Sequence, residues 1–208
     1  EWPVAAEARL LAGGGVFVLT GRESVRPALH ASGNPDRPVR RVMIAGGGKV
    51  GLRLARGLVG QCEVKIIEAD RKRCAYLASE LPAEMLVLQG DGTDEDLLLD
   101  ENVSDMDLFV AVTSDDEDNI LGAMLAKRLG ARRVIALINR RAYADMVQGG
   151  PIDIGMSPAQ VSIGSLLAHV RRGAVVQVHS LRRGAAAVLE LIVRGEKKTS
   201  KVVGRRIE

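Results

Sequence analysis

Aromatic side chains and cysteines are scarce in this sequence, and no apolar run approaches the length of a membrane span. Aromatic residues make up only 2% of the chain, which excludes the stacking platforms on which single-stranded nucleic acids bind. Cys62 and Cys74 are isolated, without metal-ligand spacing or a disulfide framework, as is usual in a reducing cytosol. Any role at a membrane is therefore expected to be exerted from the aqueous side.

The charge balance says little about a partner. Lysine and arginine number 29 against 26 acidic residues, a formal net charge of +3, and the two signs are interspersed. The pI of about 9.1 is thus a poor sign of nucleic-acid binding, and we expect none. With 47% hydrophobic residues, the chain can bury an ordinary core.

What the sequence does contain is a glycine-rich turn between an apolar run and a helix. Val42–Ala45 is typical of a buried parallel strand, and a G-x-G-x-x-G motif follows it at 46–51. Apolar residues at helical spacing come next, and a second apolar run, Val64–Ile67, ends at Glu68, twenty residues after the second glycine. This order and spacing form the dinucleotide-binding fingerprint.

Each part of the fingerprint has a physical role. Gly46 permits a tight turn, Gly48 lets the backbone approach a pyrophosphate, and Gly51 lets the helix pack close to the strand. The helix N-terminus offers unpaired N–H groups and a positive dipole end to phosphates, while Glu68 can accept hydrogen bonds from ribose hydroxyls. The alternative interpretation is a glycine-rich turn in an α/β domain that binds nothing.

Strands and helices continue to alternate as far as about Ser157, which predicts a Rossmann-like doubly wound parallel sheet. Four further strands are expected, at Met85–Leu88, Leu108–Val112, Val134–Ile138 and Ile152–Ile154. Helices are expected at Arg71–Glu80, Asp94–Asp100, Asp116–Leu129 with Gly130 as its cap, and Arg141–Gln148. Ligands of such sheets bind at the carboxyl ends of the strands, so nucleotide contacts are expected in the segments that follow them.

Several candidate residues have two readings. Glu68 is either a ribose ligand or a solvated strand end, and Asp91 is either a ligand or the acceptor of an Asx-type turn. Lys49 can reach a phosphate or remain solvated in the first turn of the helix. The acids Asp115–Asp118 resemble a metal cluster, although they also suit a helix N-terminus.

The ends of the chain look incomplete. A strand and a helix expected before residue 32 cannot bury their apolar faces alone, and residues 32–38 have the composition of a linker. A helix expected at Ser157–Arg171 is apolar on more than one side, which predicts packing against a second subunit. Strands are expected at Val175–Val178 and Ala187–Val193.

Five segments carry a resemblance to a known family: RVMIAGGGKVG at 41–51, QGDGTD at 89–94, AVTSDDEDNI at 111–120, AMLAKR at 123–128 and SLRRGA at 180–185. With them the chain resembles the second half of the NAD-binding regulatory subunits of Trk-type bacterial potassium uptake systems, which contains an RCK, or KTN, domain. The resemblance extends over nearly the whole chain.

The resemblance implies a division of the chain into four parts. Residues 1–37 would be the tail of a preceding RCK C-terminal domain with a linker, and 38–156 the Rossmann-like RCK N-terminal domain. Residues 157–173 would be a crossover helix and 174–208 the start of another RCK C-terminal domain. The chain would then be a fragment of a longer protein with two such halves.

The resemblance also implies a ligand and its contacts. Carried over one by one, the nucleotide contacts are Gly46, Gly47, Gly48, Lys49, Val50, Glu68, Asp91, Thr113 and Ser114. The cofactor would be NAD or NADH, with ATP or ADP as further candidates at the same site. Many RCK domains have an arginine on the fifth strand, facing the phosphates, whereas this sequence has Leu137, which leaves the phosphate charge less compensated.

The expected function is that of a cytoplasmic nucleotide sensor, peripheral at the inner face of the plasma membrane, that regulates a potassium-transporting membrane subunit and forms a homo-oligomer, a dimer or a tetramer. Glu68 favours NAD(H) over NADP(H). Arg71–Arg73 argue mildly the other way, but they fit a solvated first turn of the next helix. An enzyme is not expected, because no clustered Lys, Tyr, His or Ser follows Ser157. The alternative is an NAD-dependent oxidoreductase with a truncated substrate domain.

Overall fold

The computed structural model describes residues 27, 38–147, 150–159, 161–163, 166, 175–181 and 186–191. The chain divides into a unit that ends at Pro38 and a unit that begins at Val39, and only the second is described below. Apart from residue 27, the elements predicted before residue 32 lie outside the described residues. So does most of the helix predicted at 157–171, although 158–159, 161–163 and 166 are helical. In the described part of the chain, no helix is both long and apolar enough to cross a membrane.

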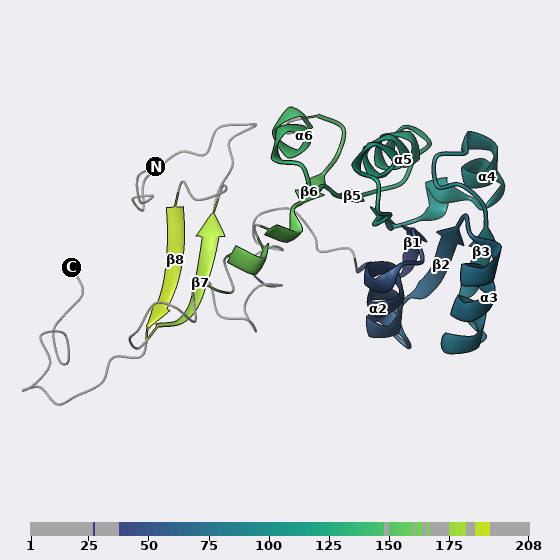
Figure 1. Cartoon of the computed structure of the whole chain (residues 1–208), viewed down its shortest axis with the longest axis horizontal. Coiled ribbons are helices and arrows are strands. Elements are labelled where there is room, and N and C mark those ends of the chain that lie inside the picture. Colours follow the sequence, from purple (N-terminus) through teal and green to yellow (C-terminus); the bar gives the residue numbers. More distant parts are fainter. Residues whose placement is uncertain are drawn as a thin grey trace, which may run out of the picture. The chain divides into compact units, whose positions relative to one another are not determined.

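Six parallel strands form one sheet in the order β3-β2-β1-β4-β5-β6 (Figure 1). They are β1 (Arg41–Ala45), β2 (Glu63–Glu68), β3 (Leu86–Gln89), β4 (Leu108–Ala111), β5 (Val134–Leu137) and β6 (Ile154–Met156). The chain winds outward from β1 to β3 and then returns to β4 on the other side of β1. The strand order therefore reverses between β1 and β4, and the predicted Rossmann-like sheet is confirmed.

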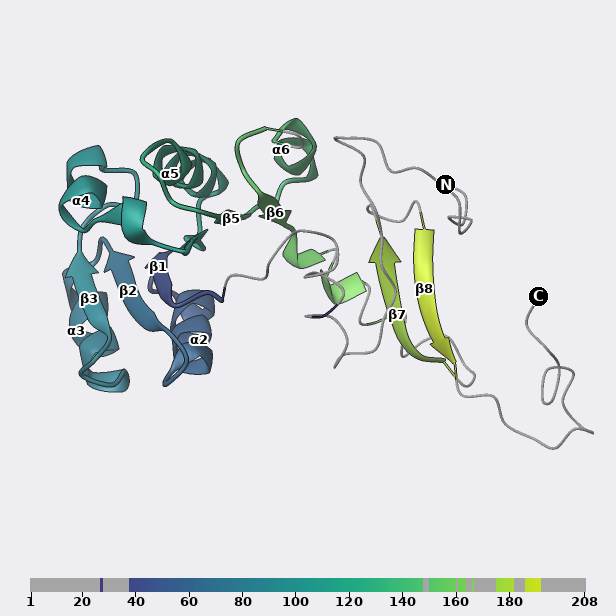
Figure 2. The same ribbon diagram turned by 180° about the vertical axis from the view of Figure 1, so that it is seen from behind.

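Helices cover both faces of the sheet (Figures 1 and 2). They are α2 (Lys49–Leu58), α3 (Arg71–Glu80), α4 (Glu95–Asp100), the 3₁₀ helix η2 (Val103–Asp105), α5 (Asp116–Arg128) and α6 (Arg141–Met146). The predicted helix at Arg71–Glu80 is confirmed to the residue. Gly130 follows α5 with a φ of 111°, as a helix-ending glycine requires.

The alternation of side chains along β1 divides the core into two layers. Met43 and Ala45 pack with buried side chains of α4, α5 and α6 on one face of the sheet. Val42 and Ile44 pack with those of α2 and α3 on the other. All four residues are buried, because β1 lies at the middle of the sheet with a helical layer on each side.

The sixth strand lies two residues further along the chain than the sequence predicts. Ile154 pairs with Ile135 and Met156 with Leu137, so the predicted strand at Ile152–Ile154 is wrong in its bounds. Asp153 explains the shift, since its carboxylate accepts the N–H of Val134 at 2.8 Å and holds this segment at the start of β5. α6 likewise ends at Met146, earlier than the predicted Gln148.

The two late strands form an antiparallel hairpin, β7 (Val175–Leu181) with β8 (Ala186–Leu191). Their existence is predicted correctly. β7 is longer than expected, because Ser180 and Leu181, which the sequence places in the connection, pair with Ala187 and Ala186.

Candidate functional site

A cavity of about 310 Å³ lies at the carboxyl ends of β1, β2, β3 and β4. Its lining comes from the segments that follow those strands and from the first turn of α5: Ala45, Gly46, Gly48, Ile67, Glu68, Ala69, Gly90, Asp91, Gly92, Thr93, Val112, Thr113, Ser114 and Asp118. This is the place where the strand order reverses and where parallel sheets bind their ligands. Six of the nine predicted contacts line it, while Gly47, Lys49 and Val50 do not.

The glycine turn brings β1 against the end of β4. Gly46 has a φ of 108°, and a Cβ atom there would lie 2.8 Å from the backbone nitrogen of Thr113. At Gly51 a Cβ would lie 1.9 Å from the carbonyl oxygen of Gly46, but 3.5 Å from the side chain of Ile44. Gly46 therefore has its predicted role, whereas the close approach at Gly51 is to the turn itself rather than to the strand.

Gly48 differs from its neighbours because nothing lies within 4 Å of a Cβ placed on it. Its φ of −65° is open to any residue, so neither packing nor backbone conformation requires a glycine here. Gly48 lines the cavity and is the N-cap residue of α2. A side chain at Gly48 would instead fill open space in the cavity, next to the N-terminus of α2.

No side chain of the described residues accepts a hydrogen bond from the first N–H groups of α2. α2 has no side-chain cap and no acidic residue in its first turn. The N-cap residues of α3, α4 and α5 are instead Asp70, Asp94 and Asp115, whose carboxylates accept backbone N–H groups of the first turn. Among these four helices, α2 alone presents its first N–H groups and positive dipole end without a carboxylate.

Glu68 supports the glycine turn from the end of β2. One oxygen, Oε2, accepts the N–H of Gly47 at 2.8 Å, and the other, Oε1, accepts the N–H of Asp70 at 2.9 Å. The half-buried side chain also lines the cavity, so it is more than a solvated strand end. Each carboxylate oxygen has a second lone pair, which leaves acceptor capacity for a ribose hydroxyl.

Arg73 holds the same turn from α3. Its Nε donates to the carbonyl oxygen of Gly47 at 2.7 Å, and its guanidinium lies 4.7 Å from the centre of the Tyr76 ring. The sequence places Arg73 in a solvated first turn, which is wrong for this residue because the side chain is half-buried against Gly47. Lys49 and Val50, by contrast, have exposed side chains in the first turn of α2.

Asp91 forms the turn that follows β3. Its Oδ1 accepts both the backbone N–H and the hydroxyl of Thr93, each at 2.8 Å. The Asx-type turn is therefore present, and Asp91 also lines the cavity. A role in ligand binding stays a prediction.

A buried amide fixes Thr113, a residue of the cavity wall. Asn119 is 0% exposed, and its Oδ1 accepts the N–H and the hydroxyl of Thr113, each at 2.8 Å. Its Nδ2 donates to the carbonyl of Leu137 at 2.9 Å, so one side chain joins the ends of β4 and β5. Sequence reasoning missed Asn119, although a polar residue three positions after Asp116 on a packed helix is a usable signal.

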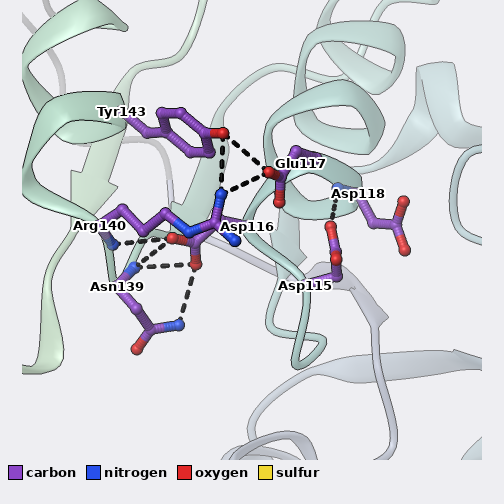
Figure 3. A network of polar contacts seen from close by, with 7 residues as sticks. All are labelled: Asp115, Asp116, Glu117, Asp118, Asn139, Arg140 and Tyr143. Atoms are coloured by element: carbon purple, nitrogen blue, oxygen red, sulfur yellow. Dashed lines mark hydrogen bonds and ion pairs between the residues drawn. The ribbon is translucent and has the colours of Figure 1, made fainter.

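The four successive acids of α5 have different environments (Figure 3). Asp115 caps the helix by accepting the N–H of Asp118 at 3.0 Å. Glu117 accepts from the Arg140 guanidinium at 2.7 Å and from the Tyr143 hydroxyl at 2.8 Å. The helix-terminus reading is thus supported by contacts, and the described residues contain no group of side chains arranged to hold a metal.

Asp116 is the buried member of this series, 5% exposed. Its carboxylate accepts the N–H groups of Asn139 and Arg140 and the side-chain amide of Asn139 at 2.8–3.0 Å. Burial alone would raise the pKa of Asp116, but these hydrogen bonds and the charge of Arg140 outweigh burial and lower it. Asp116 therefore ties the segment after β5 to the start of α5.

Leu137, the position at which many RCK domains have arginine, packs partly buried against the α2–α3 layer of the core. It does not line the cavity. The structure thus supplies no cation from this position of β5.

Comparison with known proteins places this geometry in a family. The TrkA-N domain family model matches residues 42–158. The chain is 50% identical over 192 residues to the Trk system potassium uptake protein TrkA of Halomonas elongata, covering 92% of this chain and 42% of that protein. It is 46% identical to the protein of the same name from Vibrio alginolyticus, with the same coverage. The chain therefore spans under half the length of these relatives.

Solved structures share the fold at low identity. The TrkA-N domain of the inner membrane protein ybaL from Escherichia coli has a TM-score of 0.58 at 12% identity, covering 64% of this chain and 98% of that chain. A GsuK channel bound to NAD has a TM-score of 0.56 at 18% identity, covering 71% and 26%. The Kef C-terminal domain of Shewanella denitrificans in an AMP-bound form has a TM-score of 0.50 at 20% identity, covering 64% and 84%.

Proposed function

Because this chain belongs to the TrkA-N domain family, we propose that it is a nucleotide-sensing regulatory unit of a potassium uptake system. The observation that carries the proposal is the free N-terminus of α2, which opens at Gly48 onto a cavity at the switch point of the sheet. Relatives named as Trk potassium uptake proteins supply the biological context. The nucleotide would bind with its phosphates on the glycine turn.

The ligand we propose is NAD or NADH, with AMP, ADP or ATP as competitors. Glu68 lies beside the turn with acceptor capacity for ribose hydroxyls, and its negative charge opposes a 2′-phosphate. Structural neighbours bound to NAD and to AMP are in keeping with this class of ligand. Titration of NADH and NADPH by calorimetry tests the preference, and equal or tighter binding of NADPH would contradict it.

We propose a regulator rather than an enzyme. The cavity lining described above contains carboxylates and hydroxyls but no Lys, Tyr or His of the kind that dehydrogenases use to move a proton. The alternative, an NAD-dependent oxidoreductase, predicts consumption of NADH in the presence of a carbonyl substrate. Loss of NADH absorbance at catalytic protein concentration, abolished by Gly48→Val, would favour the alternative.

Regulation would act through a potassium-transporting membrane partner, from the cytoplasmic side, and in a homo-oligomer. The coupling route we propose runs from the cavity through the turn after β4 into α5, because Thr113 and Ser114 line the cavity and α5 follows them. Coupling of the usual size, about 1–3 kcal/mol, changes activity by roughly 5- to 150-fold.

The test is potassium flux through the reconstituted transporter with the full-length protein, with and without NADH. Wild type and Gly48→Val are compared, because a side chain at Gly48 fills open space above the N-terminus of α2. Flux that ignores both the nucleotide and the substitution would remove the regulatory claim, even where NADH binding itself is measured.

A further inference from the structure

Among the four successive acids of α5, Asp118 is the one whose carboxylate is unused. Asp115, Asp116 and Glu117 each accept hydrogen bonds. Asp118 uses only its backbone N–H, and within the described residues no hydrogen bond or ion pair reaches its carboxylate. In Figure 3 its side chain points away from the group formed by Glu117, Arg140 and Tyr143. It lines the cavity instead.

The charges on the cavity wall are all of one sign. Glu68, Asp91 and Asp118 belong to the lining, and none of the described lining residues is Lys, Arg or His. Glu68 accepts two backbone N–H groups and Asp91 accepts from Thr93, whereas no hydrogen bond or ion pair among the described residues reaches the exposed carboxylate of Asp118.

Three nearby carboxylates add to the negative charge around Asp118. Asp115 and Glu117 come from the start of α5, and Asp91 comes from the turn after β3. Loss of some hydration at the cavity wall, followed by repulsion from these three charges, raises the pKa of Asp118 above its usual value. The features that attract anions come from another segment of the lining, where Gly46 and Gly48 lead into the uncapped N-terminus of α2.

We propose that Asp118 makes this site select nucleotides by phosphate charge. Its carboxylate repels each phosphate charge beyond those held at the glycine turn, so the site prefers ligands of low phosphate charge, such as AMP or a dinucleotide with one pyrophosphate, to ADP and ATP. This inference rests on the proposed function and narrows the ligand class of the same cavity.

The experiment is a set of affinities measured by calorimetry for AMP, ADP and ATP without divalent cations, on wild type and Asp118→Asn. Removing the charge should tighten AMP binding about 2-fold and ATP binding about 5- to 10-fold, as expected for partly screened charges added in series. The gain should shrink as salt is raised from about 0.05 M to about 0.5 M, because the Debye length shortens.

Glu117→Gln is the matched control. It makes the same change of charge at the neighbouring residue, but that carboxylate faces Arg140 and Tyr143 and does not line the cavity. It should change each of the three affinities less than Asp118→Asn does, because Glu117 lies outside the cavity lining. Since the Asp118 carboxylate has no partner to lose among the described residues, Asp118→Asn should unfold at the same temperature as wild type or a higher one.

The outcomes distinguish a failure of charge selection by Asp118 from a failure of nucleotide binding itself. An Asp118→Asn gain that is the same for AMP and ATP, or that Glu117→Gln reproduces, overturns the charge-selection role while leaving nucleotide binding intact. A loss of affinity in Asp118→Asn overturns it as well, since the carboxylate would then be a hydrogen-bond acceptor for the ligand. Absence of binding of any nucleotide, NADH included, overturns the proposed function and this inference together.

Discussion

The N-termini of α2 and α5 occupy equivalent places in the fold and are built in opposite ways. Each follows one of two strands that pair at the middle of the sheet, β1 and β4, and each begins at the same edge. α2 begins at Gly48 without a cap or an acid in its first turn, whereas α5 begins at Asp115 with three acids behind it. The Asp115 carboxylate accepts one first-turn N–H group of α5, whereas no described side chain accepts any from the first turn of α2.

The comparison has an energetic side. A capping side chain contributes about 1 kcal/mol to the stability of a helix, so an uncapped α2 forgoes a contribution of that size. α2 also lacks the favourable effect of acids near the positive dipole end, about 0.3–1 kcal/mol each. A negatively charged ligand at this N-terminus would accept the free N–H groups and place negative charge at the positive dipole end. Binding would then stabilise the protein.

The largest expected effect on stability comes from adding a side chain to Gly51, where the first turn of α2 contacts the glycine turn before it. Gly51→Ala places a Cβ 1.9 Å from the carbonyl oxygen of Gly46, and backbone cannot move aside cheaply. We expect a loss of about 3 kcal/mol or more in the free energy of unfolding, measured in urea. Gly57→Ala on the same helix is the control, because nothing lies within 4 Å of its added Cβ. It should leave stability unchanged or raise it by up to about 1 kcal/mol; equal losses at both positions would contradict the close approach.

The next effect concerns the anchoring of α5. Asn119→Ala removes the acceptor of the Thr113 N–H and the donor to the carbonyl of Leu137, which leaves buried polar groups without partners. The expected loss is about 2–3 kcal/mol. Met124→Gln, on an exposed position of α5, should stay within about 0.5 kcal/mol of wild type. A loss below 1 kcal/mol at Asn119 would show that the amide does not hold the two strand ends.

A smaller effect should depend on pH. The folded-state pKa of Asp116 is lowered, so its carboxylate adds stability above its unfolded pKa of about 3.9, and this stability is lost as pH falls through the lower, folded pKa. Asp116→Asn should cost about 2 kcal/mol at pH 7 and progressively less below about pH 4. Urea midpoints between about pH 2.5 and pH 7 measure this. A constant difference over that range would be inconsistent with the assignment.

The smallest expected change in stability is that of Gly48→Ala, which should nevertheless weaken nucleotide binding clearly. Gly48→Ala adds a methyl group where nothing lies within 4 Å, so unfolding should change by no more than about 0.5 kcal/mol. Nucleotide affinity should fall at least about tenfold, or 1.4 kcal/mol, because the methyl group occupies the approach to the N-terminus of α2. The shift of melting temperature with NADH reports both quantities. Undiminished binding would mean that the phosphates lie elsewhere.

Local spacing is enough to predict much of this domain. The glycine turn, the alternation that gives the sheet, and the helix Arg71–Glu80 depend on residues close together in the chain. The bounds of β6 depend on Asp153 reaching Val134, and the anchoring of Thr113 depends on Asn119 reaching Leu137. Such contacts join segments that only the folded chain brings together, so pattern alone does not reveal them.

The site shows the same division. Sequence spacing placed Gly46, Gly48 and Glu68 on one cavity, and all three line it. It did not show that Glu68 and Arg73 hold the glycine turn from both sides, one through the N–H and the other through the carbonyl of Gly47. Both residue types also occur in solvated turns, so only their tertiary partners distinguish the two roles.

The contact of Gly46 with the end of β4 has a further consequence. At this point backbone meets backbone, since a Cβ on Gly46 would lie within 2.9 Å of Val112 and Thr113 main-chain atoms. The contact between Gly46 and the end of β4 is therefore made by main chain, which has no side-chain rotamers to freeze when a ligand arrives, and freezing a rotamer-rich side chain costs about 0.5–1.5 kcal/mol. A nucleotide that enters here meets a surface whose conformational entropy was already lost when the domain folded.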